Sequence, residues 1–201
     1  LMGVYGTPRK KYKGVRDISI LLRSRDGGKT WGDESLTALG HNEISYAFLP
    51  KGRLLAAARS ESGHVATLFS DDGGRKWSRP VQVTRDGEHP ADLTVLASGT
   101  VQLTFGRRIR PMGCGVLFSG DGGKTWDTKH EVLLAGDGVR NGDLGYPSTV
   151  QLADGTRFVR RAMIERVDQP DLPFVVTAWE DGAWPAPRGL PGVASRPCLA
   201  R

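Results

Sequence analysis

The sequence has few of the residues that build metal and redox sites. Its 201 residues include only two cysteines and four histidines. Cys114 and Cys198 lie far apart and belong to no C-x-x-C pair, so neither a zinc site nor a redox motif is indicated. The histidines show no metal-ligand spacing; they are His41, His64, His89 and His130. No cofactor or metal is therefore expected.

Long apolar runs and long helical patterns are also missing. No run is long enough to span a membrane, and no signal peptide is visible at Leu1. Twenty-seven glycines and twelve prolines punctuate short alternating apolar runs, which favours many short strands joined by tight turns. The net charge of +6 is moderate, and its densest cluster, residues 9–13, is interpreted as a solvated loop. No nucleic-acid partner is predicted.

One octapeptide occurs three times, at residues 24–31, 70–77 and 119–126, and each copy reads S-x-D-G-G-[KR]-x-W. Asp26, Asp72 and Asp121 occupy its third position. Copies of a motif that recur at nearly equal intervals along a chain are typical of repeat architectures, with one supersecondary unit per interval. Aspartate followed by two glycines is turn chemistry, because the carboxylate accepts nearby backbone N–H groups and glycine allows positive φ. Each octapeptide therefore predicts a hairpin turn, and its tryptophan is expected to be a largely buried anchor.

A second repeat lies between the octapeptides, at residues 46–59, 93–107 and 148–160. Each copy reads as strand, x-Gly turn and strand, the pattern of a β-hairpin. The two repeats together give four strands per period, as in a propeller blade.

The octapeptide is the Asp box, and the chain resembles the sialidase (neuraminidase) superfamily of Asp-box β-propellers. The resemblance implies an all-β fold with four-stranded antiparallel blades. The family propeller has six blades, of which about four are expected within residues 1–190, at about 1–40, 41–87, 88–137 and 138–190. Residues 179–184 resemble a degenerate box, and residues 191–201 are expected to form an irregular tail. In the family the boxes lie away from the catalytic pocket.

Strand direction predicts which residues reach a common pocket, because loops alternate between the two faces of a blade. The face opposite the boxes receives acids and a tyrosine that enter each innermost strand, and arginines that leave the next strand. Several arginines on one axis favour an anionic ligand, since a guanidinium binds two carboxylate oxygens at once. The candidates are Glu43, His89, Asp92, Asp143 and Tyr146 on one side, and Arg59, Arg107 and Arg108 on the other.

The resemblance assigns roles to four of these residues. Residues 42–59 look like the family unit in which a glutamate opens one strand and an arginine closes the next. By resemblance, Glu43 activates a nucleophilic tyrosine, and Arg59 and Arg107 bind the substrate carboxylate. Tyr146 stands where the nucleophile is expected. The family's Arg-Ile-Pro unit is absent and its acid/base aspartate is not identifiable; Asp17 and Asp33 are weak stand-ins.

Each candidate also has a structural interpretation. Glu43 is alternatively a residue that caps a hairpin, and Arg59 one that forms a salt bridge to Glu43 or Glu61. Tyr146 is alternatively a packing residue before a proline. Arg108 is an alternative to Arg107, since one of two adjacent residues must face outward. Asp92 and Asp143 are alternatively turn-forming residues, and His89 is alternatively a structural residue or part of the pocket wall.

The resemblance implies an exo-sialidase-like hydrolase that removes terminal sialic acid, or a related acidic sugar, with retention. The substrate is then a sialylated or other acidic glycan, and the location secreted or periplasmic. The alternative is a non-catalytic glycan-binding or scaffold module, because a fold does not fix a function.

Overall fold

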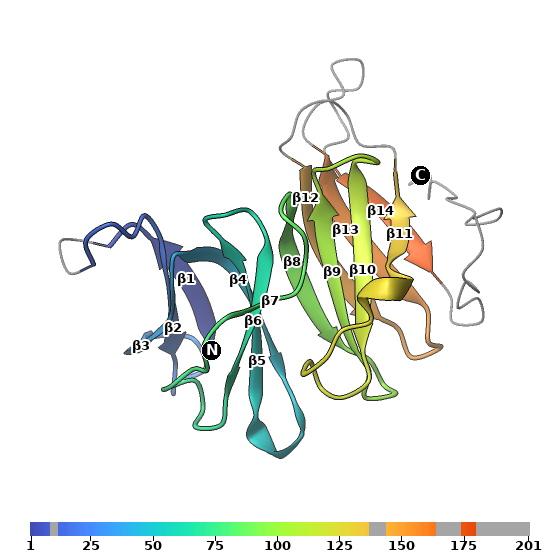
Figure 1. Ribbon diagram of the computed structural model, residues 1–201. Helices are drawn as coiled ribbons and strands as arrows, with labels where there is room; N and C mark the ends of the chain where they lie inside the picture. The colour runs from blue at the N-terminus through green and yellow to red at the C-terminus, as the bar shows by residue number, and fades with distance from the viewer. Residues whose placement is uncertain (9–11, 137–143, 164–173, 180–201) are drawn as a thin grey trace. The chain divides into compact units, whose positions relative to one another are not determined.

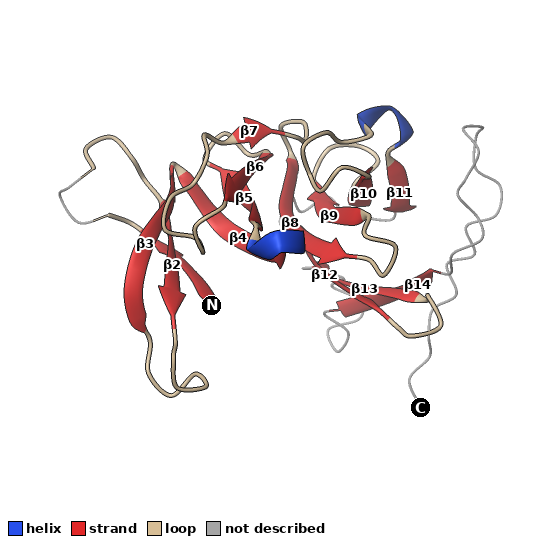
Figure 2. Ribbon diagram, turned by 90° about the horizontal axis from the view of Figure 1, so that it is seen from below, coloured by secondary structure: helices blue, strands red, loops and turns tan. Residues whose placement is uncertain are grey.

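Almost all regular structure in the computed structural model is β-strand (Figure 1, Figure 2). The structure describes residues 1–8, 12–136, 144–163 and 174–179. In these ranges, helical structure is limited to two short 3-10 turns, η1 (Pro50–Gly52) and η2 (Thr128–His130). None of the described helical segments has the length and apolar character that crossing a membrane requires. The all-β prediction is confirmed.

The strands form four antiparallel sheets, each made of strands consecutive in the sequence. The first contains β1 (Met2–Gly6), β2 (Ile18–Arg23) and β3 (Gly32–Leu39). The second contains β4 (His41–Phe48), β5 (Leu54–Ser60), β6 (Val65–Ser70) and β7 (Val81–Gln82). The third contains β8 (Glu88–Val95), β9 (Val101–Arg107), β10 (Gly113–Ser119) and β11 (Val132–Ala135). The fourth contains β12 (Leu144–Gln151), β13 (Arg157–Met163) and β14 (Phe174–Trp179).

The chain divides into two compact units, Leu1–Asp86 and Gly87–Arg201. In the first unit, apolar side chains on both faces of β5 are buried, from Leu54 to Ala58. In the second, β9 and β10 are buried along their whole length, and Cys114 lies in an apolar cluster with Val116 and Phe118. Short, almost continuous apolar runs are typical of strands covered on both faces.

All three Asp boxes form the same turn, which connects the last two strands of their sheets. They connect β2 to β3, β6 to β7, and β10 to β11. In the second box, Ser70 donates to Asp72 at 2.8 Å, and the Gly74 and Lys76 N–H groups donate to Ser70 and Asp72. Both glycines of every box have positive φ, between 71° and 90°. Local turn chemistry therefore fixes these hairpins.

The tryptophans of the boxes are less buried than the sequence predicts. Trp31 is 41% exposed, and Trp77 and Trp126 are half-buried. Trp77 packs against an apolar cluster of Ala38, Ala56, Ala58 and Leu68, and its ring centroid lies 5.6 Å from that of Tyr46. Because this cluster includes Ala38 from the preceding sheet, the packing around the second box involves two sheets. The prediction of buried tryptophans is wrong for Trp31.

Replacing these two tryptophans by alanine is expected to have unequal effects on stability. Trp77→Ala removes a side chain packed in an apolar cluster and should cost about 3 kcal/mol of unfolding free energy. Trp31→Ala removes a side chain that keeps much of its contact with water and should cost about 1 kcal/mol. Chemical denaturation of both variants measures the difference. Equal losses would contradict this difference in packing.

The box carboxylates make the fold sensitive to acid. Hydrogen bonds, first from the Thr30 hydroxyl and then from its N–H group, lower the pKa of Asp26 from 3.8 to about 2. Thr125 does the same for Asp121, whose pKa is also about 2. Because these pKa values are depressed in the folded state, the stabilisation is present above pH 3.8 and is lost as the pH falls toward 2.

Thermal melting followed across this range should therefore show a steep loss of stability below pH 3.8. Asp26→Asn should flatten that loss, because the amide does not titrate. Lys29→Gln, in the same turn, is the matched control and should keep the wild-type slope. An unchanged slope in Asp26→Asn would rule out this carboxylate as a source of the acid sensitivity.

Candidate functional site

Glu43 and Arg59 form an ion pair at the end of the second sheet opposite its Asp box. Arg59 Nη1 donates to Glu43 Oε2 at 2.7 Å, and both side chains are largely buried. Glu43 sits at a bulge in β4, where the register skips from the Asn42–Arg59 pair to the Ile44–Ala58 pair. Its φ is +40°, in the left-handed region. A bulge re-aims a side chain, and strained backbone of this kind is concentrated at functional sites.

Asp17 lies at the same end of the first unit. Its carboxylate accepts from Asn42 Nδ2 at 2.9 Å, which places it beside the residue that precedes Glu43. Glu61 Oε1 accepts the Arg16 and Asp17 N–H groups, both at 2.8 Å, and fixes the backbone there. The first unit thus gathers three carboxylates and Arg59 on the face predicted from strand direction.

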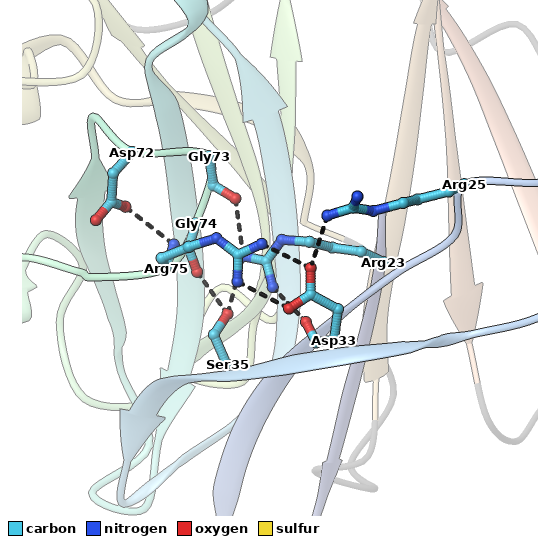
Figure 3. Close-up of polar contacts among 8 residues, drawn as sticks. All are labelled: Arg23, Arg25, Asp33, Ser35, Asp72, Gly73, Gly74 and Arg75. Atoms are coloured by element: carbon cyan, nitrogen blue, oxygen red, sulfur yellow. Dashed lines mark hydrogen bonds and ion pairs between the residues drawn. The ribbon is translucent and has the colours of Figure 1, made fainter.

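Asp33, the other aspartate considered as an acid, lies instead beside the second Asp box (Figure 3). Its carboxylate forms a two-pronged ion pair with the Arg75 guanidinium, at 2.8 and 2.6 Å. Hydrogen bonding and charge from Arg75 lower the pKa of Asp33 to about 2. Arg23 donates to the Gly73 carbonyl, and Ser35 to that of Gly74, so β2 and β3 hold the next sheet's box. Asp33 is ionised at neutral pH and has a structural role.

Arg107 is buried between two carboxylates in the second unit. It is 8% exposed, and its Nε lies 3.3 Å from Glu88 Oε1 and 3.2 Å from Glu131 Oε1. Its Nη1 donates to the Pro111 carbonyl at 2.8 Å. Glu88 is 2% exposed. Sequence reasoning placed Arg107 on a substrate carboxylate and missed both glutamates. Its charge is already matched by side chains of its own sheet.

Arg108, the alternative to Arg107, contacts Tyr146. The Arg108 guanidinium carbon lies 5.7 Å from the centre of the Tyr146 ring, and Arg108 Nε donates to the Leu144 carbonyl at 3.1 Å. Tyr146 is 39% exposed. It occupies a bulge in β12, where the register skips from Gly145 to Ser148, and its φ is +48°.

A close backbone approach sets the distance between these two residues. A Cβ atom built on Gly106 would lie 2.8 Å from Gly145 Cα, and one built on Gly145 would lie 2.6 Å from Gly106 Cα. Both positions therefore require glycine, and Gly145 also has a φ of +112°. The end of β9 and the start of β12 touch here, which brings Arg108 to Tyr146.

Of the remaining candidates, Asp92 and His89 have contacts that support the fold, and the others lie outside the described residues. Asp92 accepts the Thr149 N–H at 2.8 Å and so ties β8 to β12. His89 is buried next to a cis His89–Pro90 bond, at a bulge near the start of β8. Asp143, the tail at 191–201 and all of the possible box at 179–184 except Trp179 lie outside the described residues.

The innermost strands of the last three sheets thus share one irregularity near their start: a bulge interrupts β4, β8 and β12. Two of these bulges hold Glu43 and Tyr146, the residues that sequence reasoning selected as a catalytic pair. They belong to different compact units, so their meeting in one pocket remains a prediction.

No metal site accompanies these groups in the part of the chain that the structure describes: no three His, Cys, Asp or Glu side chains cluster suitably. A depression of about 380 Å³ in the first unit is lined by Pro8, Tyr12, Ile18, Ile20, Glu34, Ser35 and Leu36. None of the predicted site residues lines it, so it does not mark the predicted site.

Solved structures with this fold include several glycosidases. The Hadza microbial sialidase Hz136 has a TM-score of 0.58 at 16% identity, over 83% of this chain and 39% of its own. The alpha-L-arabinanase of Penicillium chrysogenum has a TM-score of 0.52 at 16% identity, over 69% of this chain and 45% of its own. A protein of unknown function from Dyadobacter fermentans DSM 18053 has a TM-score of 0.63 at 26% identity, over 80% of this chain and 44% of its own. The chain thus spans less than half the length of these structures.

These likenesses establish the fold class as part of a sialidase-type propeller, in agreement with the sequence prediction. No curated relative matches the chain. The model of the BNR repeat-like domain matches residues 2–159, which include all three Asp boxes and the four sheets as far as β13. The chain therefore belongs to the family of BNR repeat-like domains.

Proposed function

We propose that this chain forms part of a retaining exo-glycosidase that removes a terminal acidic sugar, with sialic acid as the first candidate. The observation that carries the proposal is the matched geometry of Glu43 and Tyr146. Both are non-glycine residues with left-handed φ at bulges in innermost strands. Such strain costs about 1–3 kcal/mol per residue and persists where the surrounding structure needs it.

A tyrosine nucleophile suits an acidic sugar for an electrostatic reason. The anomeric carbon of sialic acid bears a carboxylate, which repels an attacking carboxylate but not a neutral phenol. Sialidases are the known exception to the usual carboxylate pair for this reason. A phenol has an ordinary pKa of about 10 and needs an adjacent base. Glu43, held by Arg59 at 2.7 Å, is proposed as that base.

The remaining roles fall to residues at the same ends of the sheets. Arg59 is proposed to bind the substrate carboxylate. Arg107 is left out of this role, because Glu88 and Glu131 already contact its guanidinium. Asp17 is proposed as the acid that protonates the leaving oxygen, because it lies beside Asn42 at the end that carries Glu43. Two displacements at the anomeric carbon then give retention.

A panel of fluorogenic glycosides tests the proposal on the complete protein. It contains an α-sialoside, a uronide and an α-L-arabinofuranoside, so that acidic and neutral sugars are compared directly. Hydrolysis of an acidic member with retention, followed by NMR of the first-formed anomer, is the expected result. Hydrolysis of the arabinoside alone would refute the acidic substrate. Binding of acidic glycans without hydrolysis of any member would support a non-catalytic glycan-binding module instead.

A further inference from the structure

The contact between Arg108 and Tyr146 places a permanent positive charge against a phenol ring. The guanidinium carbon lies 5.7 Å from the ring centre, within the range of about 6 Å at which a cation is attracted to an aromatic face. An arginine side chain stays charged at every pH at which a protein is folded. The charge is therefore independent of pH.

The backbone holds this charge in place. Arg108 Nε donates to the Leu144 carbonyl, two residues before Tyr146 in the same strand. The Gly106–Gly145 approach leaves no room for a side chain between β9 and β12. The bulge at Tyr146 turns its side chain out of the regular alternation of β12. Arg108 is therefore fastened to the strand that carries the tyrosine.

Other ionisable side chains lie on the strands and turns around this end of the second unit. Arg107 on β9 is matched by Glu88 on β8 and Glu131 before β11. His89 on β8 is buried, and its carbonyl faces Gly106 and Gly145. Arg160 on β13 is exposed and pairs in register with Ser148. Arg107 and its two glutamates form a buried cluster of their own, whereas Arg108 contacts the Tyr146 ring.

We propose that Arg108 is a positioning residue that activates Tyr146, by stabilising the phenolate that forms when the hydroxyl proton is lost. A nearby cation favours the ionised form of a phenol, and a tyrosine nucleophile needs that form. In the reaction, Tyr146 Oη gives its proton to the general base and bonds to the anomeric carbon, while the glycosidic bond breaks and the leaving oxygen takes a proton from the general acid. The inference rests on the proposed function only for this last step.

The test measures the ionisation of Tyr146 without any substrate. The protein is labelled with 3-fluorotyrosine, and each tyrosine is titrated by fluorine NMR, with Tyr146 assigned by its loss in Tyr146→Phe. Arg108→Gln is expected to raise the Tyr146 midpoint by about one pH unit. Arg110→Gln, an exposed arginine of the same turn, is the matched control and should leave the midpoint unchanged. An unchanged or lowered midpoint in Arg108→Gln overturns the proposal.

A second measurement needs no change to Arg108. In the labelled wild-type protein, Tyr146 should titrate at a lower pH than the exposed Tyr5 in the same spectrum. A Tyr146 midpoint at or above that of Tyr5 also overturns the proposal. Because neither titration uses a glycoside, a protein that hydrolyses nothing but shows both shifts refutes the glycosidase and supports the role of Arg108. Hydrolysis of an acidic glycoside with unshifted Tyr146 midpoints would support the glycosidase and refute the role of Arg108.

Discussion

Tyr146→Phe is expected to lower the kcat of the complete protein on its acidic glycoside by at least about a thousandfold. Removing a nucleophilic oxygen leaves only the stabilisation from binding, and comparable losses in other enzymes are of this size or larger. The ring, its exposure and its contact with Arg108 are kept, so binding of an acidic sugar should change little. Steady-state hydrolysis and equilibrium binding of a product sugar measure the two effects separately.

Tyr5→Phe is the matched control for this change, because Tyr5 is an exposed tyrosine on β1 of the other compact unit. It should keep the wild-type rate. A Tyr146→Phe protein with near-normal turnover would remove Tyr146 from the mechanism, whatever sugar is cleaved. Loss of binding together with turnover would point to a role in holding the sugar rather than in attacking it.

Arg107→Met is expected to cost about 3–5 kcal/mol of unfolding free energy. Removing one partner of a buried ion pair leaves an uncompensated charge, and costs of this size are typical. Here the change removes the Arg107 charge from Glu88, which is 2% exposed, and from Glu131. Chemical denaturation of the variant measures the loss.

Adding Glu88→Gln and Glu131→Gln to Arg107→Met should recover part of that stability, because no buried carboxylate is then left without a cation. Arg108→Met serves as the comparison, since Arg108 is less buried and should cost less. If Arg107→Met instead folds normally and loses affinity for an acidic sugar, Arg107 is a substrate ligand, as the sequence first indicated, and its glutamates only position it.

The Asp boxes and hairpins were predictable because their chemistry is local. A serine, an aspartate and two glycines determine a turn within eight residues, and the same hydrogen bonds recur in all three copies. The strand that precedes each box, which is β2, β6 or β10, contains a short apolar run that is visible in the sequence.

The surroundings of the site residues were not predictable in the same way. Arg107 contacts Glu88 on β8 and Glu131 just before β11, and no pattern near Arg107 in the sequence marks them as its partners. The bulges at Glu43 and Tyr146 depend on strand register, which alternation alone does not reveal. The sequence anticipated the contact of Arg59 with Glu43 but not the partners of Arg107.

The contact between the second Asp box and the first sheet has a consequence for how such chains evolve (Figure 3). Arg75 lies in the box, and its partner Asp33 lies on the outermost strand of the preceding sheet. A duplication that copies one period therefore copies the turn, its tryptophan and its cation together. Lys29 and Lys124 keep a positive charge at the equivalent position of the other boxes. A duplicated sheet thus already carries the box cation, and only the outermost strand of the preceding sheet must supply a carboxylate for it.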